Sequence, residues 1–468
     1  MDQFRDDVYK EEIMGLFTDF YELTMCASYF DNQNFKSATF DLLVRRLPEN
    51  RSYILFTGLE QVLWYLQTVK FTEQHLAYLK QQGFKLQFLE YLRDFKFTGD
   101  VWAVPEGTVA FPNEPLIRIT APIIEAQIIE TFLLNTVNLQ TTMSTKASRV
   151  VHAARGKSVI EFGLRREHGI DAGMKVARSS YIAGCMGTSN VLAGMVYGIP
   201  VFGTMAHSFV MSYPRELDAF RAFVRSFPDK ATLLIDTYEE FAGLEKAIIV
   251  AKELEAKGFQ LNGVRLDSGD LAESSKRVRK ILDDNNLRYV KIFVSGDLDE
   301  YRIDELLSKG AKIDSFGAGT KMGTSSDRPY IDVIYKLCEN MTSPNVYSPI
   351  MKLSFDKSTL PGRKQIYRYK DYEGNYVRDV IALDSEKVLG AEPLLVKVMS
   401  DGKMIYTLPS LNQIRGYASE NLSRLPEKCK AFTDAKVYPV ELSQKLQELV
   451  RTLREKIVKN EVYNYNNI

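Results

Sequence analysis

Between residues 158 and 337, short apolar runs alternate with longer segments, and no other feature constrains the fold of this chain as strongly. The apolar runs have the length of strands, whereas the longer segments have the apolar spacing of helices. Such alternation predicts parallel βα units, arranged as an irregular α/β barrel or as an open doubly wound sheet. The six or seven predicted strands are 158–166, 199–203, 232–236, 261–266, 290–294, 313–316 and 331–337.

Helices are predicted between these strands, and a different pattern flanks them. The predicted helices are 127–154, 182–197, 239–257, 271–284 and 299–309. The preceding part mixes strands at 38–44 and 116–119 with helices at 53–68 and 73–93. The following part predicts antiparallel strands over 350–410, with turns at Gly374 and Gly402, and an amphipathic helix over 441–458.

The composition excludes several classes of protein. Lys+Arg and Asp+Glu both number 60, so no excess of basic charge points to nucleic acid. The four cysteines are far apart without a CxxC pair, which disfavours zinc ribbons and redox dithiols and fits a reducing compartment. No apolar stretch reaches the length of about 18 residues that a membrane span needs. The acidic start lacks the apolar core of a signal peptide, so we expect a cytoplasmic protein without membrane contact.

Charged and small polar residues follow nearly every predicted central strand. In barrel and doubly wound folds the ligand binds at the carboxyl ends of the strands. Because so many strands share this pattern, it predicts a substrate site at that edge. The residues are Arg165, Arg166, Thr204, His207, Asp236, Arg265, Asp267, Asp270, Asp297, Thr320 and Lys321.

A glycine-rich segment, 317–323, follows a late strand of the predicted barrel. Gly317 and Gly319 let the backbone approach a ligand closely, and successive N–H groups there can bind a phosphate. The spacing matches neither GxGxxG nor a P-loop, which disfavours a dinucleotide or Walker-type site. A tight βα turn without a ligand is the alternative.

Two kinds of titratable residue are candidates for chemistry at this edge. Asp267 and Asp297 could hold Mg²⁺ or accept sugar hydroxyls, whereas Asp270 and Asp299 are expected to be helix caps. His207 has small neighbours that leave room for a ligand, with a hydrogen-bonded core histidine as the alternative. The absence of HExxH and GxSxG motifs gives no support to a metalloprotease or an α/β-hydrolase.

Six ordered motifs resemble the nicotinate phosphoribosyltransferase family over nearly the whole length. Each motif alone is weak, but together they are highly specific. They are 18–25 (TDFYELTM), 161–166 (EFGLRR), 203–208 (GTMAHS), 263–270 (GVRLDSGD), 316–320 (FGAGT) and 361–364 (PGRK).

The resemblance implies transfer of 5-phosphoribose from phosphoribosyl pyrophosphate to nicotinate, giving nicotinate mononucleotide and pyrophosphate in NAD salvage. It implies ATP as a co-substrate, hydrolysed through phosphorylation of His207, and Mg²⁺. It also implies an N-terminal α/β sandwich-like domain (1–140), an irregular α/β barrel (141–345) and a C-terminal domain packed beside the first (346–468). A homodimer with a shared active site is expected, in which Tyr21 completes the partner's site.

The physical chemistry of the residues fits this reaction. Pyrophosphate departure needs cations and N–H groups that are already in place. The flat, anionic nicotinate suits the aromatic faces of Tyr21 and Phe162, while Arg265 and Thr204 suit its carboxylate. Arg165 is a second candidate, with a surface salt bridge as its alternative role. The other expected substrate contacts are Ser295, Gly296, Gly317, Gly319 and Thr320, and Mg²⁺ is assigned to Asp267 and Asp297.

Three other functions stay open at this level. A nicotinamide phosphoribosyltransferase would read a neutral amide with a carboxylate rather than with an arginine. A barrel lyase or isomerase acting on sugar phosphates would share the phosphate loop but needs an acid–base Lys or Glu on a strand. A non-catalytic binding scaffold would be indicated by loss of His207, Asp267 or the 317–323 loop, all of which are present.

Overall fold

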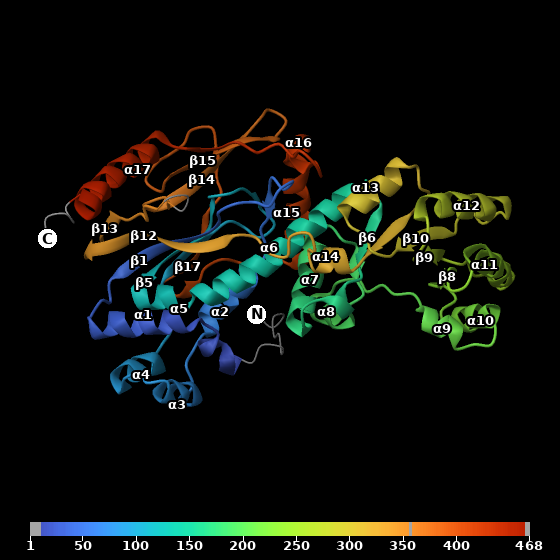
Figure 1. Ribbon diagram of the computed structural model, residues 1–468, viewed down its shortest axis with the longest axis horizontal. Helices are drawn as coiled ribbons and strands as arrows, with labels where there is room; N and C mark the ends of the chain where they lie inside the picture. The colour runs from blue at the N-terminus through green and yellow to red at the C-terminus, as the bar shows by residue number, and fades with distance from the viewer. Residues whose placement is uncertain (1–10, 355–357, 464–468) are drawn as a thin grey trace. The chain divides into compact units, whose positions relative to one another are not determined.

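The computed structural model describes residues 11–354 and 358–463, which divide into two compact units (Figure 1). The first unit consists of residues 143–329. The second consists of 11–142 together with the described residues from 330 onward. The division into three domains with boundaries at 140 and 345 stays a prediction.

A six-stranded parallel sheet forms the centre of the first unit, in the order β7-β6-β11-β10-β9-β8. Helix α11 packs on β9 and α12 packs on β10 (Figure 1), so the predicted α/β class is confirmed. The strands are β6 (Ser158–Glu161), β7 (Gly187–Thr188), β8 (Thr232–Leu234), β9 (Gly263–Leu266), β10 (Lys291–Ser295) and β11 (Ser315–Ala318). The helices are a 3-10 turn (Leu164–Arg166), α7 (Ile170–Ile182), α8 (Val191–Tyr197), α9 (His207–Met211), α10 (Glu216–Ser226), α11 (Glu240–Glu255), α12 (Leu271–Asp284), α13 (Glu300–Ser308) and α14 (Thr320–Gly323).

The chain that follows β7 links the two edges of this sheet. Val201 extends the β7 edge through a parallel bridge to Thr188. The chain beyond Val201 then reaches the opposite edge, because His207 Nδ1 lies 3.2 Å from the Oγ1 atom of Thr237, which follows β8. The segment 201–207 thus runs from the β7 edge to the β8 edge of the sheet on the side of the carboxyl ends.

Several predicted elements differ from the structure. The strand predicted at 199–203 is reduced to the isolated bridge of Val201, and the helix predicted at 73–93 is divided into α3 (Glu73–Gln81) and α4 (Leu86–Arg93). The strand predicted at 158–166 ends at Glu161, and its basic end is the 3-10 turn. The helix predicted at 182–197 was wrong, because α7 ends at Ile182 and the strand β7 precedes α8. The run at 331–337 belongs to β12 (Val333–Ser343), which pairs antiparallel with β1 in the second unit. Strand partners are chosen by tertiary contacts, which a local apolar pattern does not specify.

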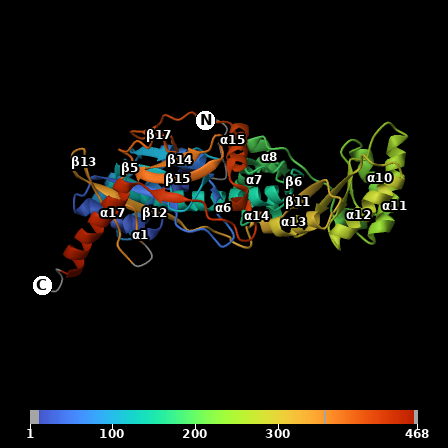
Figure 2. The same ribbon diagram turned by 90° about the horizontal axis from the view of Figure 1, so that it is seen from above.

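The second unit is built on a seven-stranded antiparallel sheet, in the order β13-β12-β1-β5-β3-β17-β18. A four-stranded sheet, β16-β14-β15-β19, and the pair β2-β4 accompany it, and α17 packs on β15 (Figure 2). The hairpins at Gly374 and Gly402 confirm the antiparallel pattern predicted for 350–410. The strands are β1 (Ser37–Val44), β2 (Ile54–Leu55), β3 (Asp100–Ala103), β4 (Val109–Ala110), β5 (Pro115–Pro122), β12, β13 (Val346–Pro349), β14 (Lys364–Lys370), β15 (Tyr376–Leu383), β16 (Glu392–Pro393), β17 (Val396–Ser400), β18 (Lys403–Met404) and β19 (Val440–Leu442).

Helices cover the seven-stranded sheet and bury a large apolar core. Strand β1 is buried along almost its whole length, with Leu42 and Val44 fully inaccessible. The helices are a 3-10 turn (Glu11–Leu16), α1 (Phe20–Asp31), α2 (Leu59–Thr68), α3 (Glu73–Gln81), α4 (Leu86–Arg93), α5 (Ile123–Ile128), α6 (Glu130–Ala153), α15 (Leu411–Arg424), α16 (Glu427–Lys430), α17 (Gln444–Ile457) and a terminal turn (Val458–Tyr463). Within the described ranges, every helix is too short or too polar to cross a bilayer.

Candidate active site

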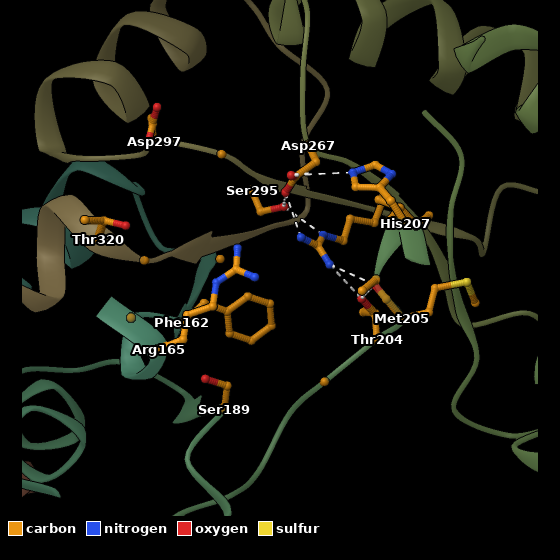
Figure 3. A pocket seen from close by; sticks show the side chains of 18 of the residues that line it. Phe162, Arg165, Ser189, Thr204, Met205, His207, Asp267, Ser295, Asp297 and Thr320 are labelled. Carbon is orange, nitrogen blue, oxygen red and sulfur yellow. Dashed lines mark hydrogen bonds and ion pairs between the residues drawn. The ribbon is translucent and has the colours of Figure 1, made fainter. Parts of the chain in front are cut away.

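A pocket of about 500 Å³ lies at the carboxyl ends of the parallel strands in the first unit (Figure 3). The turns after β6, β7, β9, β10 and β11 and the segment 203–207 line it. The structure brings together there all the residues of this unit that were expected to contact substrate or Mg²⁺, whereas Asp236, Asp270 and Lys321 of the strand-end set do not line the pocket. The expected residues that line it are Phe162, Arg165, Thr204, His207, Arg265, Asp267, Ser295, Gly296, Asp297, Gly317, Gly319 and Thr320.

Arg265 is the centre of a hydrogen-bond network that joins three turns. Its Nε donates to Ser295 Oγ at 2.8 Å, and its Nη1 donates to Thr204 Oγ1 at 3.0 Å and to the Met205 carbonyl at 3.2 Å. Its Nη2 donates to Asp267 Oδ1 at 2.7 Å. A guanidinium has five N–H groups, so one N–H of Nη2 stays available. Arg265 is therefore held in a fixed orientation with a donor to spare.

Asp267 is the carboxylate acceptor of this network (Figure 3). Its Oδ1 also accepts from the Ser295 hydroxyl, and its Oδ2 lies 3.9 Å from His207 Nε2. Burial alone would raise the pKa of Asp267, but the Ser295 hydroxyl, the Arg265 guanidinium and His207 together lower it below its ordinary value. The carboxylate is consequently ionised at neutral pH.

The backbone beside Asp267 is held by Asp236, which follows β8. Asp236 Oδ2 accepts from the Asp267 N–H and from the Ser268 hydroxyl, both at 2.8 Å. Asp270 and Asp299 cap α12 and α13, which confirms the expectation for both residues.

The turn after β10 brings Gly296 and Asp297 into the pocket. Gly296 has a φ of +98°, and a Cβ there would lie 2.3 Å from the Asp267 carbonyl oxygen, so only glycine fits. Asp297 has a φ of 47°, a conformation that Asp tolerates better than most residues. Among the residues that the structure describes, no donor reaches the Asp297 carboxylate, which is exposed to the pocket.

Two turns form the cationic side of the pocket. The 3-10 turn carries Arg165 and Arg166, and Arg166 donates from Nη1 to Thr320 Oγ1 at 3.0 Å. This bond joins the 3-10 turn to the start of α14, where first-turn N–H groups lack intrahelical acceptors. Arg165 is exposed, and no acceptor within the described part of the chain binds its guanidinium.

The two predicted loop glycines are also required by packing. A Cβ on Gly317 would lie 2.7 Å from the Phe293 ring and 2.9 Å from the Phe162 ring. These two rings meet edge to face with centroids 5.5 Å apart. A Cβ on Gly319 would approach the Phe162 carbonyl to 3.2 Å. Gly317 thus lets Phe162 reach the pocket wall.

Tyr21 lies elsewhere, in the first turn of α1 in the second unit, and its side chain is 51% exposed. Burial, followed by a hydrogen bond to Glu22 and nearby acidic charges, raises the pKa of Tyr21. Its expected role in a partner's site is not tested by a single chain and stays a prediction.

Ser189 lines the pocket but was missed by the sequence analysis. It directly follows β7, a two-residue strand inside a stretch that was predicted to be helical. The segment Gly187-Thr188-Ser189 has too few apolar residues to signal a strand, so the sequence does not indicate that Ser189 lies at a strand end.

Comparison with known proteins extends over nearly the whole chain. Family models match in three segments: the nicotinate phosphoribosyltransferase N-terminal domain (16–138), the nicotinate phosphoribosyltransferase family (158–358) and its C-terminal domain (389–450). A nicotinate phosphoribosyltransferase of Mycobacterium tuberculosis is 44% identical over 448 residues, which cover 95% of both chains. One of Bacillus subtilis is 39% identical over 466 residues, covering 93% of this chain and 94% of that protein.

Solved structures agree with the sequence comparison. The crystal structure of human nicotinic acid phosphoribosyltransferase has a TM-score of 0.83 at 29% identity, covering 93% of this chain and 99% of the human chain. Identity above 30% over almost the full length, together with family models for all three segments, confirms the resemblance seen in the motifs. The chain belongs to the nicotinate phosphoribosyltransferase family.

Proposed function

We propose that this enzyme transfers the 5-phosphoribosyl group of phosphoribosyl pyrophosphate to the ring nitrogen of nicotinate, giving nicotinate mononucleotide and pyrophosphate in NAD salvage. Full-length similarity to proteins of that name carries the proposal. The pocket supports it, since cations, backbone N–H groups and an aromatic ring meet in a space of about 500 Å³.

The cationic side of the pocket suits the phosphates. Arg165 has free donors, and Arg166 is fixed against the Thr320 turn, so both guanidinium groups face one region. When pyrophosphate departs, negative charge accumulates on the leaving group, and donors that are already oriented stabilise it without further rearrangement. We assign Arg165, Arg166, Gly319 and Thr320 to the phosphates.

The opposite side suits the base. Phe162 offers a ring face, and Arg265 keeps one N–H free beside the Thr204 hydroxyl. A carboxylate gains a charge-assisted hydrogen bond from Arg265, whereas the neutral amide of nicotinamide gains less. We therefore assign the nicotinate carboxylate to Arg265 and Thr204.

His207 is the residue we assign to ATP coupling. Its Nδ1 contacts Thr237 and its Nε2 faces the ionised Asp267, so the ring is held between two partners. The Asp267 carboxylate stabilises positive charge on the ring, which develops when an imidazole nitrogen accepts a phosphoryl group.

Mg²⁺ fits this site only together with the substrate. Within the described residues, no group of three His, Cys, Asp or Glu could hold a metal ion. Mg²⁺ commonly binds through one or two carboxylates plus substrate phosphates. Asp297 fits that donor set because no donor of the described residues reaches its carboxylate, whereas Asp267 is already engaged. Bound there, the ion would neutralise charge on the diphosphate.

We also propose a homodimer in which Tyr21 contributes to the partner's site, and a cytoplasmic location. Tyr21 is exposed enough to meet a second chain. All four cysteines are buried free thiols, which suits a reducing compartment.

The decisive experiment measures pyrophosphate release with nicotinate and with nicotinamide. Losing one partner of a buried charge pair costs about 2–5 kcal/mol, so we expect nicotinate to have the larger kcat/KM by about 30- to 4,000-fold. Equal kcat/KM values for the two bases would refute the assignment of the base.

ATP coupling has its own measurement. Incubation with γ-labelled ATP is expected to label the protein with acid-labile, base-stable phosphate, and His207→Ala should abolish both the label and coupled ATP hydrolysis. Weak uncoupled transfer should survive, because other residues bind the ribosyl group. Full labelling of His207→Ala would contradict the role of this histidine.

A further inference from the structure

Glu161 and Glu167 form an acidic pair beneath the pocket that the proposed reaction does not use. Glu161 ends β6, is fully buried, and accepts from the Gly163 N–H and, at 2.5 Å, from the Thr188 hydroxyl. Glu167 follows the 3-10 turn that carries Arg165. Both Glu167 carboxyl oxygens are buried, and no N–H or O–H donor of the described residues reaches them.

The Glu167 carboxyl group fills a space that three glycines leave open. A Cβ on Gly163 would lie 2.4 Å from Glu167 Oε1, and one on Gly323 would lie 2.5 Å from the same atom. A Cβ on Gly173 would lie 3.3 Å from Glu167 Oε2. Gly163 precedes the 3-10 turn and Gly323 ends α14, so the carboxyl group is wedged between the two turns that form the cationic side.

Burial and proximity favour one proton between the two carboxyl groups, because a Cβ on Gly163 would lie close to Glu167 Oε1 and 3.1 Å from Glu161 Oε1. Burial first, and then the charge of Glu161 and a hydrogen bond to it, raises the pKa of Glu167 to about 10. Burial also raises the pKa of Glu161, although hydrogen bonds from Thr188, Gly163 and Glu167 oppose this. Ionised carboxylates only accept hydrogen bonds, so a bond between these two requires a proton on one of them. Glu161 already accepts from the Gly163 N–H and the Thr188 hydroxyl, so Glu167 is the partner that keeps the proton and donates.

The other charges on the surrounding elements have partners elsewhere or face the pocket. On the 3-10 turn, Arg166 donates to Thr320 and Arg165 lines the pocket. The remaining pairs are Lys321 with Asp299, at 3.3 Å, and Lys175 with Asp171 on α7, at 2.9 Å. His168, the residue after Glu167, is exposed, and Glu161 is the charged group that raises the pKa of Glu167.

We infer that neutral Glu167 is a positioning residue, which donates a shared proton to Glu161 and clamps the 163–166 turn against the 319–323 turn. This inference rests on the proposed function, because the clamped turns carry Arg165, Arg166 and Thr320, which we assign to the phosphates. Ionisation of Glu167 would put a second negative charge beneath that anion site and break the bond between the two carboxyl groups.

Two variants separate positioning by the neutral group from simple packing. Glu167→Gln keeps the shape and a donor toward Glu161, so we expect its KM for phosphoribosyl pyrophosphate to stay within about threefold of wild type. Glu167→Ala leaves the turns unsupported, so we expect that KM to rise about tenfold or more, with the preference for nicotinate unchanged. Equal losses in both variants would overturn the inference.

The pH profile gives a second readout. Wild-type kcat/KM for phosphoribosyl pyrophosphate should fall as the pH approaches about 10, whereas Glu167→Gln, which has no proton to lose, should keep it over that range. The same alkaline fall in both proteins would contradict a titrating Glu167.

A spectroscopic measurement tests the proton without any activity. Infrared spectra at neutral pH should contain the carbonyl stretch of a protonated carboxyl group that Glu167→Gln lacks. Glu273→Gln, on the exposed face of α12 where Glu273 pairs with Lys276, should leave that band intact. An unchanged band in Glu167→Gln would refute the shared proton, even if the wild type proved inactive with nicotinate. Conversely, if Glu167→Gln lacks the band and the wild type has no transferase activity, the shared proton is supported and the proposed function is refuted.

Discussion

Arg265 shows how the fold fixes the orientation of a residue at a strand end. Most of its donors are occupied by Ser295, Thr204, Met205 and Asp267, so the side chain has little freedom left. A fixed guanidinium loses little conformational entropy when it binds a carboxylate, and its planar fork cannot be reproduced by an ammonium group. Charge alone would not supply this selectivity.

Substitutions of Arg265 and Arg165 are expected to impair the use of different substrates. Arg265→Lys keeps the charge but loses the fork, so we expect kcat/KM for nicotinate to fall by about 30-fold or more and the preference over nicotinamide to shrink. Arg165→Ala should instead raise KM for phosphoribosyl pyrophosphate by about 10- to 100-fold without changing base preference. Steady-state kinetics with both bases distinguish them, and Arg215→Lys, on the exposed Arg215–Asp218 pair, is the matched control. Unchanged base preference in Arg265→Lys would contradict its assignment.

Glu130 is a buried carboxyl group in the second unit that links pH to stability. Burial first, and then the charge of Glu22, raises its pKa to about 7, while Gln127 donates to it at 2.9 Å. Between its ordinary pKa of 4.5 and about 7, the unfolded chain loses this proton and the folded chain keeps it. The free energy of unfolding therefore falls as the pH rises through that window.

Replacing Glu130 with Gln should remove this dependence. We expect the Tm of the wild type to fall between about pH 5 and about pH 7, reflecting a loss of the order of 2 kcal/mol, and Glu130→Gln to show a smaller fall. Glu73→Gln is the control, because Glu73 is exposed and paired with Arg93. Identical pH slopes of Tm in wild type and Glu130→Gln would contradict the raised pKa.

The turns that follow the parallel strands determine the site more than the strands do. β9 and β10 are adjacent and parallel, so the turns after them lie side by side, and Gly296 packs directly on the Asp267 backbone. This close approach brings Ser295 within hydrogen-bond reach of both Asp267 and Arg265. A short connection thereby links the turns after two strands to one carboxylate, that of Asp267.

Gly296→Ala tests this close approach. A positive φ costs a non-glycine residue about 1–2 kcal/mol, and overpacking against the Asp267 carbonyl adds about 1–3 kcal/mol. Gly258→Ala is the matched control, because Gly258 has a φ of +80° but nothing within 4 Å of its missing Cβ. We expect Gly296→Ala to lower Tm more than Gly258→Ala and to lose kcat, while Gly258→Ala keeps its activity. Equal effects on Tm and activity would show that the contact with Asp267 is unimportant.

The molecule as a whole places its candidate residues in two different units. The pocket belongs to the first unit, residues 143–329, whereas Tyr21 belongs to the second unit. An exposed aromatic ring can stack on a flat base and contribute about 0.5–1.5 kcal/mol beyond area burial. In a homodimer, a second chain can supply that ring.

Subunit exchange tests the shared site. A Tyr21→Ala chain and an Arg265→Ala chain, each impaired alone, should recover activity when mixed, up to about half of wild type per heterodimer, because one site regains both residues. Tyr21→Phe should be mild, since the ring face remains. No recovery despite demonstrated exchange would assign Tyr21 to its own subunit or to its core.

The sequence was informative where local rules decide the structure. Helix α12 has the predicted bounds, because the Asp270 cap and the apolar spacing are both local signals. The polar residues that follow predicted strands include Arg265, Asp267 and His207, which line the pocket. Their position was predictable because parallel strands direct their carboxyl ends to one edge of the sheet. The six motifs identified the family, which the comparisons confirmed.

Only the tertiary structure decided which strands pair and which donors are already used. Thr188 lies in a strand because it pairs with β6. Strand β12 pairs with β1 although nearly 300 residues separate them in the sequence. The occupied donors of Arg265, the open donors of Arg165 and the buried Glu161–Glu167 pair follow from contacts between distant segments. Such contacts depend on burial and geometry that no single segment encodes, because desolvation and hydrogen bonding are properties of the assembled fold.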